Sequence, residues 1–242
     1  LRWAVAGRPE AKLQALKEKW MKEFPDRREM GVVICDLSPG TIDAMTKRTT
    51  LLITTVGPFL RYGTPVLESC IKNGTHYIDS TGEYPWVKAM VERFHDAAKE
   101  KAVIVVSQCG FDSVPTDRCT WKPVKMLRDK LGTGAGKTTF ALHYLSGGMT
   151  SDGTFESALN LLDTLPLSTI AASSHAGSIS PIPVPCQPRQ FPIRRKPDLG
   201  IVCDSVFVAV NRPPALRTWG LLDGGKYYGP DFAWTEVLQR RG

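Results

Sequence analysis

The sequence predicts an α/β fold, with a doubly wound parallel sheet in its first half and a smaller α+β unit in its second half. Short apolar runs alternate with segments of helical periodicity over about the first 110 residues, which is typical of consecutive βαβ units. The apolar runs do not alternate with polar residues, as expected for strands buried on both faces. After residue 117 this alternation stops, and loops rich in Gly and Pro become frequent.

Five strands are expected in the first half, each an apolar, β-branched run that ends at a turn. The run LLITTV at 51–56 lies at the centre of this half and is closed by Gly57 and Pro58. Gly permits a tight turn there, and Pro suits a turn or the first position of a helix. The expected strands are residues 1–6, 31–37, 51–56, 76–79 and 102–107.

Helices are expected between these strands. Leu13, Leu16, Trp20 and Phe24 recur at spacings of three and four among Lys and Glu residues, which indicates an amphipathic helix. A second long pattern follows Pro85, and Asn73-Gly74 ends a shorter one. The expected helices are residues 9–24, 64–72 and 85–101, with a short helix or turn at 39–46.

The second half is less regular. We expect helices at 121–130 and 154–165, the latter with Thr150 or Ser151 as its N-cap, and strands at 139–144 and 201–210. Six prolines lie between positions 181 and 197, which predicts a loop. The predicted domains are therefore residues 1–117 and residues 118–242, with a Pro-rich loop at 170–200.

The composition narrows the function classes. The net charge is +7, but the basic residues are scattered and no zinc-finger or RNA-binding motif is present, so nucleic-acid binding is disfavoured. The six cysteines form no CxxC pair, which predicts reduced thiols in an intracellular protein and no metal site. The basic run at 189–196 is interpreted as a solvated loop or as a contact with an acidic lipid surface.

A phosphate-binding ATPase loop is also disfavoured. Gly132 and Gly136-Lys137-Thr138 have three residues between the glycines, whereas the GxxxxGK[ST] motif requires four. The segment also follows an expected helix, whereas such a loop follows a strand.

Gly7 and Arg8 follow the first expected strand. In dinucleotide-binding sheets the end of the second strand meets the adenosine ribose, where Arg accommodates a 2′-phosphate and Asp or Glu binds a 2′-hydroxyl. Arg8 therefore favours NADP over NAD, with Lys12 as a second cation. The alternative is an exposed Arg at a strand end with no ligand.

Two further strand ends are candidates for the cofactor. Asp36 and Leu37 could flank an adenine, although a plain turn explains Asp36 equally well. The turn formed by Thr55, Val56, Gly57 and Pro58 could pass close to the ribose or pyrophosphate, because Gly allows close approach. A tight turn without a ligand is the alternative.

Carboxylates follow the next two strands. Asp79 and Glu83 come after one strand, and Asp112 and Asp117 after another. They could orient a substrate or relay protons, and equally they could cap helices or hold turns. No catalytic residue can be chosen from this pattern.

Several segments resemble the saccharopine dehydrogenase-like oxidoreductases, a group that includes the mycobacterial trans-acting enoyl reductases. CGFDSVPTD is the most specific of them. The segments are WAVAGR at 3–8, TTVGPFLRYG at 54–63, GTHYIDSTGE at 74–83, CGFDSVPTD at 109–117, SGGMTSDGTFESALNLL at 146–162 and YGPDFAWTE at 228–236.

The resemblance implies a Rossmann-like NAD(P)-binding domain followed by an α+β domain for substrate and homodimer contacts. It implies that Arg8 lies at the adenosine phosphate, that residues 55–58 turn over the cofactor, and that Cys109, Gly110, Phe111 and Asp112 lie near the nicotinamide. Relatives reduce lipid-like substrates, such as an enoyl intermediate. Animal relatives are associated with lipid droplets and mitochondria, so the compartment stays open. The resemblance assigns no residue of this sequence as a catalytic base.

The sequence departs from this pattern at both ends. Family members begin with a strand and a Gly-rich turn that cradles the pyrophosphate, and they continue well beyond the YGPDFAWTE segment. We therefore expect a Rossmann-like sheet whose first βα unit is missing. Two alternatives to an oxidoreductase that acts on a lipid-like substrate stay open. One is a non-catalytic binding module of lipid metabolism. The other is a true saccharopine dehydrogenase. Its site should gather several arginines for the carboxylates of its substrate, but the strand-end turns here hold few arginines, with Arg61 as the exception.

Overall fold

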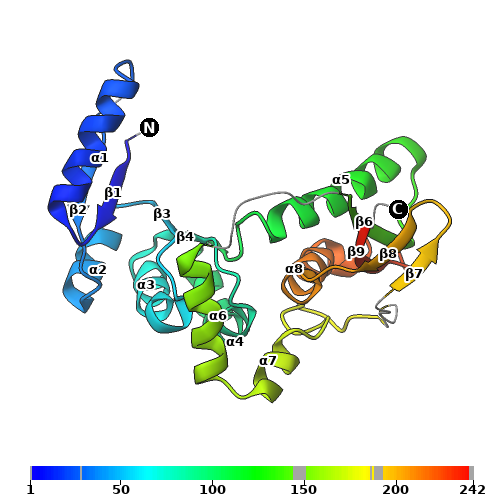
Figure 1. Ribbon diagram of the computed structural model, residues 1–242. Helices are drawn as coiled ribbons and strands as arrows, with labels where there is room; N and C mark the ends of the chain where they lie inside the picture. Colours follow the sequence, from blue (N-terminus) through cyan, green and yellow to red (C-terminus); the bar gives the residue numbers. More distant parts are fainter. Residues whose placement is uncertain (1, 28, 144–150, 186, 188–192, 240–242) are drawn as a thin grey trace.

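The structure is a computed structural model that describes all residues except 1, 28, 144–150, 186, 188–192 and 240–242. The fold is elongated (Figure 1). A group containing β1, α1, β2 and α2 lies at one end, α3, α4 and α6 lie in the middle, and a second sheet with α5 and α8 lies at the other end. The termini therefore lie far apart.

The first strands form a two-stranded parallel sheet. β1 (Ala4–Gly7) pairs with β2 (Gly31–Ile34) in register along their whole length. α1 (Glu10–Glu23) connects them, and its Trp20 ring packs edge-on against Trp3, with centroids 5.0 Å apart.

The next three strands form a separate parallel sheet in the order β3-β4-β5. β3 (Leu51–Thr54) pairs with β4 (His76–Asp79), which pairs with the short β5 (Val105–Val106). The predicted α/β class with parallel strands is confirmed. Among the described residues, however, β1 has no strand beside it except β2, and β3 has none except β4.

One face of the β3-β4-β5 sheet forms the core of the first half. Leu52, Tyr77 and Val105 pair across this face and pack under α3 (Phe59–Asn73) and α4 (Tyr84–Glu100). The Tyr77 side chain is fully buried. Burial of such apolar surface provides the main stabilisation of the sheet.

The opposite face of the same sheet is open. Alternate strand residues point to opposite sides, so the neighbours of the core residues face away from α3 and α4. Ile53 is 67% exposed and Ile104 is 63% exposed, and Leu51 and Val106 are also exposed. We call these four residues the open apolar face.

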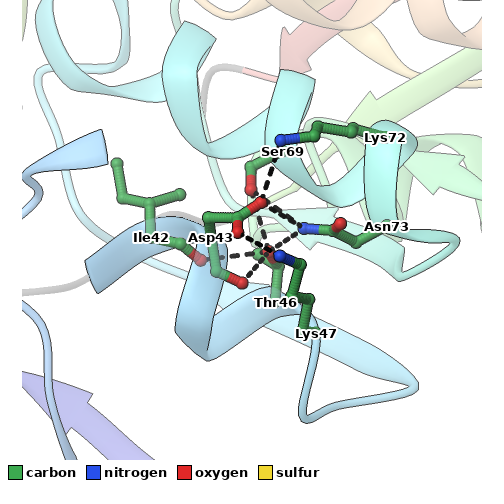
Figure 2. Close-up of polar contacts among 7 residues, drawn as sticks. All are labelled: Ile42, Asp43, Thr46, Lys47, Ser69, Lys72 and Asn73. Atoms are coloured by element: carbon green, nitrogen blue, oxygen red, sulfur yellow. Dashed lines mark hydrogen bonds and ion pairs between the residues drawn. The ribbon is translucent and has the colours of Figure 1, made fainter. Parts of the chain in front are cut away.

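Helix α2 (Pro39–Thr46) joins the two parallel sheets because it packs on α3 through polar side chains (Figure 2). The Asn73 amide donates to Asp43 Oδ1 at 3.1 Å and to Thr46 Oγ1 at 2.8 Å. The buried Thr46 hydroxyl also lies 2.8 Å from the Ser69 hydroxyl. The α2–α3 polar cluster comprises Asp43, Thr46, Lys47, Ser69, Lys72 and Asn73.

The second half begins with α5 (Ser113–Leu131), which ends at Gly132 in the left-handed conformation. β6 (Lys137–Leu142), α6 (Asp152–Thr164) and α7 (Leu167–Ser173) follow. The Ser151 hydroxyl accepts the Thr154 N–H at 3.3 Å, which confirms Ser151 as the N-cap of α6. Thr150 lies outside the described residues.

A mixed sheet completes the second half, in the order β6-β9-β8-β7. β9 (Ala233–Gln239) runs parallel to β6 and antiparallel to β8 (Gly200–Asp204), and β7 (Ile193–Lys196) is antiparallel to β8. α8 (Val208–Leu221) packs on α5, and a short 3-10 turn, η1 (Asp223–Gly225), follows it. The buried residues Trp219, Tyr228, Phe232 and Trp234 lie in this second core.

Three expectations for the second half are wrong. The strand expected at 201–210 ends at Asp204, and residues from Val208 onward belong to α8. Most of α8 and all of β9 lie beyond residue 210, where no helix or strand was predicted. Both are largely buried and show no polar face, so their sequences carry no amphipathic pattern. The Pro-rich loop expected at 170–200 contains the end of α7 and the whole of β7, whereas residues 189–192 of the basic run lie outside the described part of the chain.

Among the described residues, no helix is long and apolar enough to cross a lipid bilayer.

Candidate functional site

Parallel strands place the candidate residues at their carboxyl ends, where ligands bind in open α/β sheets. At the end of β1, the Cys35 N–H donates to the Gly7 carbonyl at 2.9 Å, so Arg8 and Asp36 leave neighbouring strand ends. Arg8 and Lys12 are exposed at the start of α1. No ion pair within the described part of the chain engages either cation.

Asp36 binds its own turn. Its Oδ1 accepts the Ser38 N–H at 2.9 Å and the Thr41 hydroxyl at 2.6 Å. Hydrogen bonds from Ser38 and Thr41 hold the pKa of Asp36 well below its usual range. Leu37 adopts a positive φ of 68° and packs against the core instead of standing free beside a ligand. The structure thus gives both residues a structural role, and their contact with an adenine stays a prediction.

The turn after β3 is exposed from Thr55 to Gly57, and its Gly57–Pro58 peptide is cis. A Cβ on Gly57 would lie 3.4 Å from the Ser157 hydroxyl of α6, so α6 passes beside this turn. The Arg61 guanidinium also donates to Asn160 of α6 at 3.3 Å. The turn therefore lies between the strand end and α6.

Glu83 caps the helix that follows this turn. Its carboxylate accepts the backbone N–H groups of Phe59 at 2.6 Å and Leu60 at 2.8 Å, at the N-terminus of α3. The side chain is only 2% exposed. A helix N-terminus attracts an anion because its first N–H groups are unpaired and its dipole is positive there. At α3, an internal carboxylate already fills that position.

Asp79 joins the ends of β4 and β5. Its Oδ1 accepts the Thr81 N–H at 3.0 Å and the Gln108 N–H at 2.9 Å. The Cys109 N–H donates to the Asp79 carbonyl at 2.7 Å. Burial raises the pKa of Asp79, and Oδ2 has no partner among the described residues, so the carboxyl is neutral over a wider pH range than usual. Asp79 therefore holds the β5 end in place.

The segment after β5 is the most accessible part of the site. Cys109 and Asp112 are exposed, Phe111 is 70% exposed, and Gly110 lies against Ser80. A Cβ on Gly82 would meet only Asp112 Oδ2, at 4.0 Å, so space remains between the β4 and β5 ends. Burial raises the pKa of Asp112. This carboxyl therefore borders the space between the two strand ends.

A buried polar network lies behind this segment. The Asn211 amide of α8 donates to Glu236 Oε2 of β9 at 3.0 Å and to the Thr116 hydroxyl of α5 at 3.2 Å. It accepts the Ser113 hydroxyl at 3.3 Å. Glu236 is 2% exposed, and its burial raises its pKa against the lowering effect of Ser205, Asn211 and Arg212. The network fixes α5, and hence Asp112, against the second half.

Sequence reasoning missed this network. Asn211 and Arg212 gave no signal, because they lie in a stretch without periodicity. The Arg212 guanidinium is partly buried, and its Nε and one terminal nitrogen have no partner within the described residues. A Glu inside the apolar run of β9 was the one available signal, since buried carboxylates require partners.

The adenosine-phosphate end of NADP fits the residues present, because Arg8 and Lys12 are exposed cations without an acidic partner at the right strand end. Among the described residues, no Gly-rich turn follows a strand of the two parallel sheets, and Glu83 occupies the N-terminus of α3, so α3 does not offer its N-terminus to the pyrophosphate. No group of three or more His, Cys, Asp or Glu side chains in the described part of the chain could hold a metal ion.

Comparison with known proteins agrees with this geometry. Residues 1–106 match the family model described as saccharopine dehydrogenase NADP binding domain. The chain is 34% identical to the human saccharopine dehydrogenase-like oxidoreductase over 202 residues, which is 80% of this chain and 46% of that protein. It is 43% identical to the rat protein of the same name over 121 residues, 48% of this chain and 28% of the rat protein.

A trans-acting enoyl reductase of Mycobacterium ulcerans is 38% identical over 117 residues, which is 48% of this chain and 27% of the bacterial protein. The chain thus spans less than half the length of these relatives. The family model covers β1 to β5, where the candidate cofactor residues at the ends of β1, β2 and β3 lie. Residues 1–106 are therefore similar to a saccharopine dehydrogenase NADP-binding domain, and this match supports NADP as the cofactor.

Proposed function

We propose that this chain takes part in NADP-dependent hydride transfer to a double bond of a lipid-like substrate. The observation that carries the proposal is the pair of unpaired cations, Arg8 and Lys12, at the carboxyl end of β1 within the segment that matches an NADP-binding domain. NADPH, when bound, supplies the hydride.

The chain's own residues bind the cofactor and orient the reacting group. Arg8 and Lys12 bind the 2′-phosphate, and the backbone of residues 55–57 borders the cofactor. Cys109 to Asp112 line the space in which the reacting group lies. Asp112 borders the space beside Gly82 and is the carboxyl that we assign to proton transfer there.

Two observations support a lipid-like substrate. One relative is named an enoyl reductase, an enzyme that acts on a carbon–carbon double bond conjugated to a carbonyl group. In addition, a cavity of about 430 Å³ with largely apolar walls opens beside the β5 end, next to Cys109. Saccharopine itself carries several charged groups and would need several arginines, and this arrangement does not favour it.

The proposal also covers the compartment and the partners of the protein. Five described cysteines are free, and Cys35 and Cys70 are buried in the core, which supports an intracellular compartment where thiols stay reduced. A second copy of the chain and a lipid-droplet or membrane surface are the partners we infer from the resemblance.

Calorimetric titration of the 242-residue chain with NADPH and NADH tests the cofactor assignment. We expect NADPH to bind at least tenfold more tightly than NADH, a difference of about 1.4 kcal/mol. Arg8→Ala should remove that difference, because the guanidinium contacts only the 2′-phosphate. Arg48→Ala, which removes an exposed Arg just after α2, should leave both affinities unchanged.

A second candidate is a non-catalytic binding module. The capping of α3 by Glu83 favours it, because the N-terminus of α3 is then not available to the pyrophosphate. Absence of NADPH binding up to millimolar concentration would support this candidate and reject hydride transfer for this chain.

A further inference from the structure

A cavity lies where the first half of the chain meets the second. It has a volume of about 430 Å³, within the range of about 300–1,000 Å³ that is typical of small-molecule sites. Its walls come from α3, α4, the end of β5, α5 and α8. The cavity therefore connects the cofactor-binding segment with the two helices that carry the buried polar network.

The walls of this cavity are mainly aliphatic. Ile71 of α3 and Val87, Met90 and Val91 of α4 form one side. Val114 of α5 and Leu221 of α8 line it as well, and both remain exposed to solvent. Binding of an apolar group is favourable here, because it removes exposed aliphatic side chains around a concave space from water.

Basic side chains gather at the same cavity. His95 and Lys99 lie one turn apart on α4, and Arg217 comes from α8. Arg217 donates to the Ile179 carbonyl at 2.6 Å, and its other terminal nitrogen lies 3.5 Å from His95 Nδ1. Within the described residues, no carboxylate forms an ion pair with any of these three side chains.

The cavity also contains one acid, Asp117. This carboxyl accepts the Thr218 hydroxyl at 2.9 Å and does not pair with Arg217. Arg217 is thus a partly buried cation with no carboxylate partner among the described residues, and its burial lowers its pKa because it disfavours the charged form. A ligand with a negative group would remove that cost and form charge-assisted hydrogen bonds.

We propose that this cavity binds the hydrocarbon chain of an amphiphile with a single anionic head, and that His95, Lys99 and Arg217 bind the head. The inference rests on the proposed function in one respect only, namely that the amphiphile is the substrate whose double bond reaches the β5 end. The head is a carboxylate or a phosphate ester, both of which a guanidinium recognises.

The experiment is calorimetric titration of the 242-residue chain with decanoate, decyl phosphate, octanoate and 1-decanol at fixed ionic strength. Decanoate should bind at least fivefold more tightly than 1-decanol, which has the same chain but no charge. Octanoate should bind about tenfold more weakly than decanoate, because two methylene groups leave the apolar wall. The stronger of decanoate and decyl phosphate identifies the head.

Variants test the position of the ligand. Val91→Trp fills the cavity and should weaken decanoate binding at least tenfold. Lys99→Gln removes an exposed cation and should reduce the preference for decanoate over 1-decanol at least twofold. Lys101→Gln removes a neighbouring charge that does not line the cavity and should leave the affinities for decanoate and 1-decanol unchanged.

Three results would overturn the inference. These are no decanoate binding up to millimolar concentration, equal binding of decanoate and 1-decanol, or unchanged binding by a Val91→Trp variant whose circular dichroism shows a folded chain. NADPH titration of the same samples separates the two proposals. Decanoate binding without NADPH binding rejects the proposed function. NADPH binding without decanoate binding rejects only the assignment of this cavity. Arg8→Ala should leave decanoate binding intact.

Discussion

At the scale of single residues, Glu83 shows how a turn residue can stabilise a distant helix. Its buried carboxylate binds two N–H groups at the start of α3, at 2.6 and 2.8 Å. Glu83→Gln keeps the shape but removes the charge and leaves one N–H facing an amide NH₂. We expect it to lower the free energy of unfolding by about 1–3 kcal/mol, measured by urea denaturation.

The matched control for this variant is Glu92→Gln on α4. Glu92 pairs with Lys88 at the surface and is 62% exposed. An exposed pair contributes little, so this change should alter the free energy of unfolding by less than about 0.5 kcal/mol. Equal effects of the two variants would contradict a capping role for Glu83.

Asp117 predicts a pH dependence of stability. Burial raises its pKa from 3.8 to about 6. A carboxyl with a raised folded-state pKa contributes stability that is complete below about pH 4 and is lost as the pH rises through about 6. Asp117→Asn should therefore stabilise the chain relative to the wild type at pH 7, by an amount on the order of 2–3 kcal/mol, and not at pH 4.

Urea denaturation at pH values from 4 to 8 measures this difference. Asp129→Asn is the control, because Asp129 pairs with Lys125 at the surface of the same helix, α5. The difference in the free energy of unfolding between Asp129→Asn and the wild type should not rise between pH 4 and 7. An Asp117→Asn difference that stays constant over this range would show that the Asp117 pKa is not raised.

The sequence predicted site residues that lie at strand ends and missed those that lie between elements. Arg8 and Asp112 follow strands whose apolar pattern is local, so their placement after the carboxyl ends of strands could be foreseen, although the two strands belong to separate sheets. Glu83 was noticed only as one of several carboxylates, because its bonds to α3 depend on how two loops fold together. Asn211 and Arg217 act across about one hundred residues of sequence, and no local pattern records such contacts.

At the scale of elements, the α2–α3 polar cluster sets the position of the first sheet relative to the second. Thr46 is fully buried and contacts both Asn73 and Ser69 of α3. Thr46→Val removes the hydroxyl and leaves these partners unsatisfied. We expect a loss of about 1–3 kcal/mol in the free energy of unfolding, and faster amide exchange in β1 and β2 by mass spectrometry.

A double-mutant cycle separates this contact from general damage. Thr46→Val and Asn73→Ala, combined, should cost less than the sum of the two single changes by about 0.5–2 kcal/mol, since both remove one interaction. Thr50→Val, at an exposed position after α2, provides a comparison outside the cluster. Additive costs for Thr46 and Asn73 would mean that their contact does not stabilise the chain.

The elements of the first half were predictable because each has its own period. β4 matches its expected bounds of 76–79, and α1 and α4 differ from theirs by a residue at each end. β5 is much shorter than expected, since it lies at a sheet edge with one neighbour. α8 was missed because Pro213 and Pro214 lie within its first two turns and its surroundings are apolar.

At the scale of the whole molecule, the separation into two parallel sheets was not foreseen. Apolar periodicity predicts strands, but it does not say which strands become neighbours. β1 pairs with β2 alone and β3 with β4 alone among the described residues, so each keeps one edge free. Beside the β3 edge lies the open apolar face of Leu51, Ile53, Ile104 and Val106.

That face has a consequence for colloidal behaviour. Copies of this chain repel one another through a net charge of +7, while free strand edges and bare aliphatic surface favour their association. Repulsion reaches about 30 Å in 0.01 M salt but about 8 Å in 0.15 M salt. The hydrodynamic radius should therefore grow as salt is added, by dynamic light scattering, and Ile53→Lys should suppress that growth. A salt-independent radius would mean that charge is not what keeps the copies apart.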